Sequence, residues 1–171
     1  MPVTGGRLRL LRALGFGAVQ HDSHVPFLSH LLGTRRLLAD WGSRPALCDA
    51  GLFHSVYGTE YFEPTRTPER DAVITVIGAE AERLAWLWCE IRRDTLDPAR
   101  ATVALRRGSR TASLEPTEAG DLATLWAADT VEQIGRMAPE ERGFARGLRS
   151  VFAAASVPAQ HAVLDLAQRI A

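Results

Sequence analysis

The sequence of 171 residues contains no lysine, and all twenty of its cationic side chains are arginine. The absence of lysine excludes Schiff-base and lysine general-base chemistry. Twenty acidic residues balance the arginines, so the formal net charge is zero. No overall field therefore favours nucleic acid or an anionic membrane as a partner. An all-arginine set of cations is typical of a high-GC bacterial genome.

Cysteine and long apolar runs are also scarce. Cys48 and Cys89 both lie in apolar helical contexts, and two isolated cysteines form no metal-finger pattern, so we expect buried, unreactive thiols. No apolar run approaches the length that spans a membrane. The basic stretch 5–12 lacks the apolar core of a signal peptide. We therefore expect a cytoplasmic protein.

The length and the hydrophobic content of 46% favour a single domain over residues 1–171. Apolar residues at three- and four-residue spacing, together with prolines at helix starts, predict a series of helices. Alternation around Gly108-Ser109 predicts a β-hairpin over 102–114 that packs on the helices. The predicted fold is all-α, a mainly helical bundle with one small β-hairpin. Its helices are expected at 6–14, 26–42, 45–57, 68–78, 79–93, 116 to beyond 133, 140–155 and 159–170.

Three polar residues fall on the apolar faces of predicted helices: His30, His54 and Asp129. An inward carboxylate costs several kcal/mol unless it meets a cation, a metal or strong donors. Two inward histidines and one inward aspartate from three helices form a ligand set suited to zinc, manganese or iron. The alternative is separate structural roles, in which Asp129 pairs with an arginine such as Arg35 or Arg136.

The apolar helix that carries His54 breaks into a polar turn with the sequence HSVYGT. Side chains on such a turn can face the mouth of a cleft, so Tyr57 and Thr59 are candidates for binding a ligand. For Tyr57 the alternative is a half-buried ring with its hydroxyl at the surface. Trp126 is a candidate for lining a hydrophobic pocket, although tryptophan in a helix more often belongs to the core. Helix capping explains Glu80 and Glu82 adequately.

The order of three polar residues resembles the ligand pattern of the metal-dependent HD phosphohydrolase superfamily: His30 comes first, then His54, and then Asp129 within the segment 127–134. The order and spacing are closest to the small hydrolases related to alarmone-hydrolysing enzymes. The resemblance implies a helical, HD-like bundle in which a histidine, an adjacent His-Asp pair and a later aspartate hold one divalent metal. Here Ser55 stands at the position of the central aspartate, and a neutral hydroxyl is a poor ligand that weakens the metal site. His21, in the preceding loop, is the candidate for an additional ligand.

A closer resemblance rests on the segments 31–42, 48–59 and 77–89. They are similar to an uncharacterised bacterial and plant family of HD-like proteins. The recurring sequence motifs of that family are "GLFHSxYGT" and a later "IG…AE.L…FC". This resemblance covers about residues 20 to 135.

Three functions fit these residues, and an enzyme acting on a small-molecule substrate is favoured. The first is a hydrolase or oxygenase in which a divalent ion held by His30, His54 and Asp129 activates a ligand. The second is a metal-free cyclase, lyase or isomerase of secondary metabolism. In that enzyme His54 or His30 is the general base for a hydrophobic substrate, and Tyr57 and Ser55 assist. The third is a non-catalytic binding or oligomerisation module, and homo-oligomers are compatible with all three.

Overall fold

The computed structural model describes residues 5–17, 26–134 and 147–170. The described chain is mainly helical and contains one sheet, which has two antiparallel strands. The predicted fold class, mainly helical with one small hairpin, is therefore confirmed. The internal contacts group the chain into two compact units, residues 1–90 and 91–171. The single-domain organisation stays a prediction.

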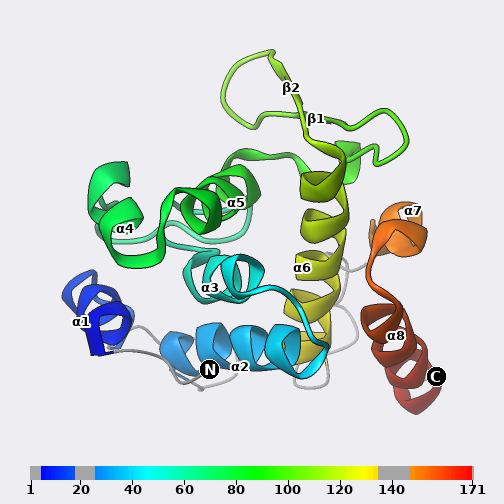
Figure 1. Cartoon of the computed structure of the whole chain (residues 1–171), viewed down its shortest axis with the longest axis horizontal. Helices are drawn as coiled ribbons and strands as arrows, with labels where there is room; N and C mark the ends of the chain where they lie inside the picture. The colour runs from blue at the N-terminus through cyan, green and yellow to red at the C-terminus, as the bar shows by residue number, and fades with distance from the viewer. Residues whose placement is uncertain (1–4, 18–25, 135–146, 171) are drawn as a thin grey trace. The chain divides into compact units, whose positions relative to one another are not determined.

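The described part of the first unit contains five helices, with α3 packed among its neighbours. Helix α3 packs against α2 and α5, and α4 packs against α5 (Figure 1). Every residue of α3 from Leu47 to Phe53 is buried, which is typical of a helix at the centre of a core rather than at its edge. The helices are α1 (Gly5–Ala13), α2 (Phe27–Asp40), α3 (Pro45–Phe53), α4 (Arg70–Ile77) and α5 (Ala79–Glu90).

Helices α3 and α4 each differ from the prediction at one end. Helix α3 ends at Phe53 rather than near residue 57, so that His54 is its C-cap and begins a turn. The turn leads to Gly58, whose φ of 83° lies in the left-handed region that glycine tolerates. Helix α4 begins at Arg70 rather than at residue 68, because Glu69 has the extended ψ of 141°.

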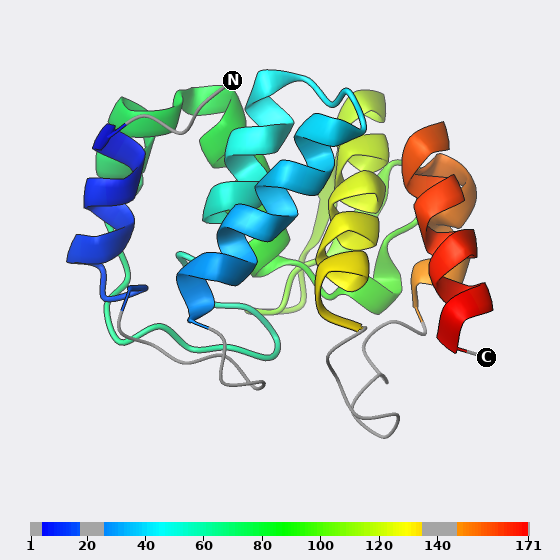
Figure 2. The same ribbon diagram turned by 90° about the horizontal axis from the view of Figure 1, so that it is seen from below.

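The second unit is built on α6. Helix α6 lies beside α8, and it also contacts α7 and η3 (Figure 2). The strands β1 and β2 pair with Val103 opposite Ala112, in the predicted hairpin. The elements are η1 (Arg93–Thr95), β1 (Thr102–Ala104), β2 (Thr111–Ser113), α6 (Pro116–Ile134), α7 (Leu148–Val151), η3 (Phe152–Ala154) and α8 (Val157–Ile170).

The helix predicted over 79–93 is too long at its C-terminal end. Ile91 forms an isolated antiparallel bridge with Leu105, and the N–H of Arg92 donates to the carbonyl of Ala104. These backbone groups bond across to the hairpin and therefore cannot continue the helix. The helix predicted over 140–155 falls partly outside the described residues. Its described part forms the short α7 and η3 instead of one continuous helix.

Cys48 and Cys89 form no disulfide, and both are buried, as predicted. Burial raises the pKa of the Cys48 thiol above its ordinary value. Within the described residues, no helix combines the length and the apolar character needed to cross a membrane.

Candidate functional site

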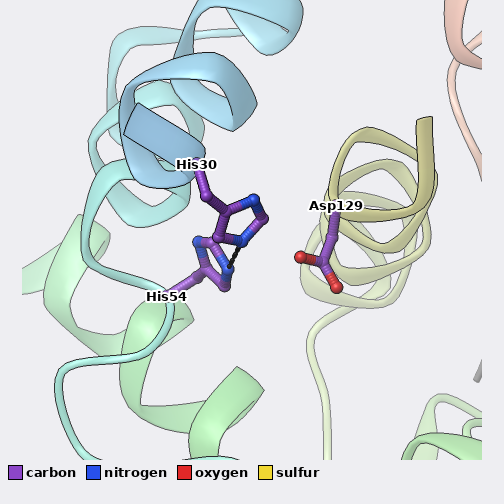
Figure 3. Close-up of side chains that lie close together, drawn as sticks. All are labelled: His30, His54 and Asp129. Atoms are coloured by element: carbon purple, nitrogen blue, oxygen red, sulfur yellow. Dashed lines mark hydrogen bonds between the residues drawn. The ribbon is translucent and has the colours of Figure 1, made fainter. Parts of the chain in front are cut away.

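The first unit brings two histidines into direct contact. His30 on α2 and His54 at the end of α3 are each only 2% exposed. Their Nε2 atoms lie 3.1 Å apart, and the imidazole planes meet edge to face at 85° (Figure 3). Two of the predicted site residues, separated by 24 positions in the sequence, therefore form one buried pair.

A main-chain contact decides how His54 is protonated. Its Nδ1 lies 2.6 Å from the carbonyl oxygen of Gly51, one helical turn earlier. A carbonyl oxygen only accepts hydrogen bonds, so Nδ1 carries the proton. In neutral His54 the Nε2 lone pair is then directed toward His30. This is the arrangement of an imidazole prepared to accept a proton or to bind a metal ion.

His30 is held by neighbours on its own helix. The ring of Phe27 packs edge-on against it, with 5.6 Å between ring centroids. The hydroxyl of Thr34 donates to the main-chain carbonyl of His30 at 3.1 Å. Phe27, His30 and Thr34 follow one another at helical spacing, and all three are buried. The face predicted from this spacing is therefore the face that α2 turns into the core.

The turn after His54 is buried rather than open. Ser55 is 3% exposed, Tyr57 5% and Thr59 7%. The Tyr57 hydroxyl donates to Oε1 of Glu82 at 2.9 Å, so the alternative of a half-buried ring with its hydroxyl at the surface is wrong. The hydroxyl oxygen of Thr59 accepts the N–H of Tyr61 at 3.2 Å. Tyr57 and Thr59 thus make internal contacts in this structure, and their ligand-binding roles stay predictions.

Glu82 has a larger role than the predicted helix capping. Its side chain is 1% exposed and receives two bonds from Arg70, from Nε and Nη2, each at 2.6 Å. Capping does not account for a carboxylate buried in this way. Burial, followed by the hydrogen bond to Glu82, raises the pKa of Tyr57 well above its usual range. No local sequence signal pairs Arg70 with Glu82, because they lie on different helices.

Asp129 lies on α6 in the second unit and is 3% exposed. Its Oδ1 accepts a hydrogen bond from Nε2 of Gln133 at 2.7 Å, and its Oδ2 lies 3.4 Å from Nη1 of the buried Arg93. The alternative of an arginine partner for Asp129 is therefore seen in this structure, with Arg93 as a partner. Arg35 lies 3.6 Å from Asp49, and Arg136 is outside the described residues.

Two further predicted ligand-binding residues remain. Trp126 is 2% exposed, and its ring lies directly against the main chain of Gly147, so that a Cβ at Gly147 would come within 2.6 Å of it. Core packing therefore accounts for Trp126 within its own unit. His21 lies outside the described residues.

These features define a mainly helical protein with a buried, oriented histidine pair. A family model described as a domain of unknown function (DUF6817) matches residues 10–93. The match includes both histidines and the Tyr57–Glu82 contact, whereas Asp129 lies beyond it. The searches of curated proteins and of solved structures found no match.

Proposed function

We propose that this protein is an HD-like metalloenzyme that hydrolyses a small-molecule substrate with one divalent metal ion bound by His30, His54 and Asp129. The observation that carries the proposal is the contact between Nδ1 of His54 and the carbonyl oxygen of Gly51. A proton on Nδ1, fixed by the carbonyl of Gly51, leaves Nε2 as the donor atom, beside Nε2 of His30. A backbone partner on the outer ring nitrogen is what metal-binding histidines typically have.

The spacing of the two nitrogens fits a shared ion. Two imidazole nitrogens that bind one tetrahedral zinc ion at about 2.0–2.1 Å are roughly 3.3 Å apart. The Nε2 atoms of His30 and His54 are 3.1 Å apart, so little movement would convert the contact into a ligand pair. Zinc, iron and manganese all accept this type of nitrogen donor.

Asp129 supplies the proposed third ligand. His30, His54 and Asp129 are a candidate ligand set by residue type and burial within the described chain. The Asp129 carboxylate has a hydrogen-bond partner in Gln133, as ligand carboxylates usually have. Arg93 stays beside the other carboxylate oxygen and offsets its negative charge when no cation is present.

Each of these residues has a separate task in the proposed enzyme. A divalent ion supplies Lewis-acid activation of water or of a substrate oxygen. His30 and His54 are neutral ligands, and Ser55 contributes no charge where HD enzymes have a second carboxylate. Asp129 then provides the single negative charge, so the ligand set with a divalent ion keeps a net positive charge. That charge favours an electron-rich substrate oxygen and its developing negative charge.

Elemental analysis of untagged protein, purified without chelator, tests the proposal. Wild type is compared with His54→Ala and with His161→Ala, which changes an exposed histidine on α8. We expect near-stoichiometric metal in wild type and in His161→Ala, and its loss in His54→Ala. Wild-type protein that stays metal-free after reconstitution with zinc, manganese and iron would contradict the proposal.

The hydrogen bond between His30 and His54 favours a second candidate, metal-free acid–base catalysis. In the contact as it stands, the Nε2–H of His30 donates to the Nε2 lone pair of His54. Such a pair can accept a proton from a substrate and pass it on. Wild-type protein that takes up no metal on reconstitution would favour this candidate. The metal-free enzyme requires a small hydrophobic substrate and no cofactor.

A further inference from the structure

Helix α5 contacts the turn that carries His54 at two points. The Cys89 thiol donates to the main-chain carbonyl of His54, with 3.2 Å between sulfur and oxygen. One carboxylate oxygen of Glu82 accepts the Tyr57 hydroxyl at 2.9 Å. Residues 82 and 89 are seven apart and therefore lie on one face of α5, about two turns from each other. This face of α5 binds both ends of the four-residue turn 54–57.

The Glu82 end of this connection is itself fixed. Arg70, the first residue of α4, donates two parallel hydrogen bonds to the two carboxylate oxygens of Glu82. A bidentate guanidinium–carboxylate pair restrains orientation as well as distance. The Arg70 guanidinium also lies over the ring of Trp86, 4.7 Å from its centroid. Glu82 therefore cannot turn away from Tyr57 without disrupting the contacts of Arg70.

The turn between the two points has little freedom. The N–H of Val56 donates to the carbonyl of Phe53, and the N–H of Gly58 donates to the carbonyl of Ser55, both at 3.1 Å. Each bond closes a tight turn, so a displacement of Tyr57 is transmitted to the main chain of His54. The imidazole follows, because its orientation depends on the main chain at positions 51 and 54.

We propose that Tyr57 and Glu82 are positioning residues that hold the Nε2 atom of His54 in place for the metal ion, with Arg70 fixing Glu82. Tyr57 then supplies no proton to the substrate, since its hydroxyl hydrogen is used in the bond to Glu82. The inference rests on the proposed function for the identity of the ligand, and on the contacts within the first unit for the mechanism. The two hydrogen bonds, Tyr57 to Glu82 and Cys89 to His54, also connect the segments 48–59 and 77–89.

Zinc affinity of the full chain tests the inference, with zinc alone as the probe in competition with a chromophoric chelator. Tyr57→Phe removes one hydroxyl and leaves the Arg70–Glu82 pair intact. We expect its zinc affinity to fall about tenfold, at the lower end of the effect of groups that orient metal ligands. Glu80→Gln is the matched control, since Glu80 lies on the same helix but is exposed and pairs with Arg44. The zinc affinity of this variant should equal that of wild type. Unchanged zinc affinity in folded Tyr57→Phe would overturn the inference.

A second measurement separates this inference from the proposed function. In metal-free protein, the ¹⁵N NMR signals of the His54 imidazole report the proton on Nδ1. We expect a single Nδ1–H form in wild type and Glu80→Gln, and a shifted or averaged signal in Tyr57→Phe. Wild type that binds neither zinc nor manganese nor iron contradicts the metalloenzyme proposal alone, whereas identical ¹⁵N signals in wild type and Tyr57→Phe contradict positioning alone. If Tyr57→Phe fails to fold, Arg70→Lys, which keeps the charge and loses the bidentate geometry, gives the same two readouts.

Discussion

The Nδ1 atom of His54 lies 2.6 Å from the carbonyl oxygen of Gly51, within a single helical turn. The orientation of the histidine thus depends on a main-chain group. Substituting a neighbouring side chain does not remove that group. Its position depends on α5, through Glu82 and Cys89. The backbone fixes which nitrogen of His54 is available, and the packing fixes where that nitrogen lies.

Zinc should stabilise the folded protein if His54 is a ligand. A ligand that binds only the native state, and is present at a free concentration of about 100 times its Kd, adds roughly 2.7 kcal/mol to the free energy of unfolding. For a chain of this size that corresponds to a rise in Tm of about 5–10 °C. Differential scanning fluorimetry with added zinc, and then with excess chelator, should show this rise and its reversal.

The control for the zinc experiment is His54→Ala, whose Tm should not respond to zinc or to chelator. His161→Ala, changed at an exposed position, should respond like wild type. An equal zinc shift in wild type and His54→Ala would mean that zinc binds elsewhere.

Stability should fall in alkaline solution because of Tyr57. The pKa of Tyr57 is raised in the folded state, so the folded protein keeps this proton where an unfolded tyrosine, with a pKa of about 10, loses it. The stabilisation is fully present below about pH 10 and is lost as pH rises from there toward the folded-state pKa. The loss has a slope of at most about 1.4 kcal/mol per pH unit. Urea unfolding of wild type and Tyr57→Phe from pH 8 to 11 measures it.

The informative quantity is the difference in unfolding free energy between wild type and Tyr57→Phe. Other titrating groups, including the buried Cys48 thiol with its raised pKa, are present in both proteins and cancel. A difference that stays constant across pH 10 would show that the Tyr57 hydroxyl is not buried against Glu82.

Gly58→Ala should destabilise the protein more than Gly42→Ala. Both glycines have a positive φ, 83° and 74°, and alanine in the left-handed region costs roughly 1–2 kcal/mol. Only at Gly58 would the new Cβ also meet neighbours, 3.1 Å from Cδ of Pro64 and 3.3 Å from the carbonyl oxygen of Phe62. Urea denaturation should therefore give a larger loss for Gly58→Ala. Equal losses would show that the turn after His54 can relax.

Two glycines of the second unit should respond to alanine with opposite signs. A Cβ at Gly147 would lie 2.6 Å from Cη2 of Trp126, and such overpacking typically costs about 1–3 kcal/mol. Gly120 lies inside α6, where a Cβ would be 3.4 Å from the carbonyl oxygen of Ala154. There alanine should stabilise by roughly 0.5–1 kcal/mol. Thermal unfolding of both variants measures these changes in stability. A Gly147→Ala variant as stable as wild type would show that the Trp126 ring can move.

Much of the fold could be predicted because its signals are local. Periodic apolar residues placed α2, proline placed the start of α6, and the alternation around Gly108-Ser109 placed the hairpin. The error at the end of α5 arose where long-range bonds compete with helix propensity. The sequence pattern places Ile91 and Arg92 in a helix, but their main-chain groups bond to the hairpin instead.

The candidate site was predictable in part. The faces of α2 and α3 put His30 and His54 inside the core, and both are buried. The roles of Tyr57 and Glu82 were not apparent, since a turn residue and a helix-start glutamate usually face solvent. Their contact joins positions 25 residues apart, and spacing along one helix carries no information about a pair on different elements.

The sequence by itself determined the helical class, the hairpin, the burial of the two histidines and the excluded lysine chemistry, because composition and periodicity act within a few residues of one another. Only the tertiary structure decided that the Nε2 atoms of His30 and His54 face each other at 3.1 Å and that Arg70 and Tyr57 share Glu82. Those relationships depend on how separate helices pack, and packing joins groups that the chain itself keeps far apart.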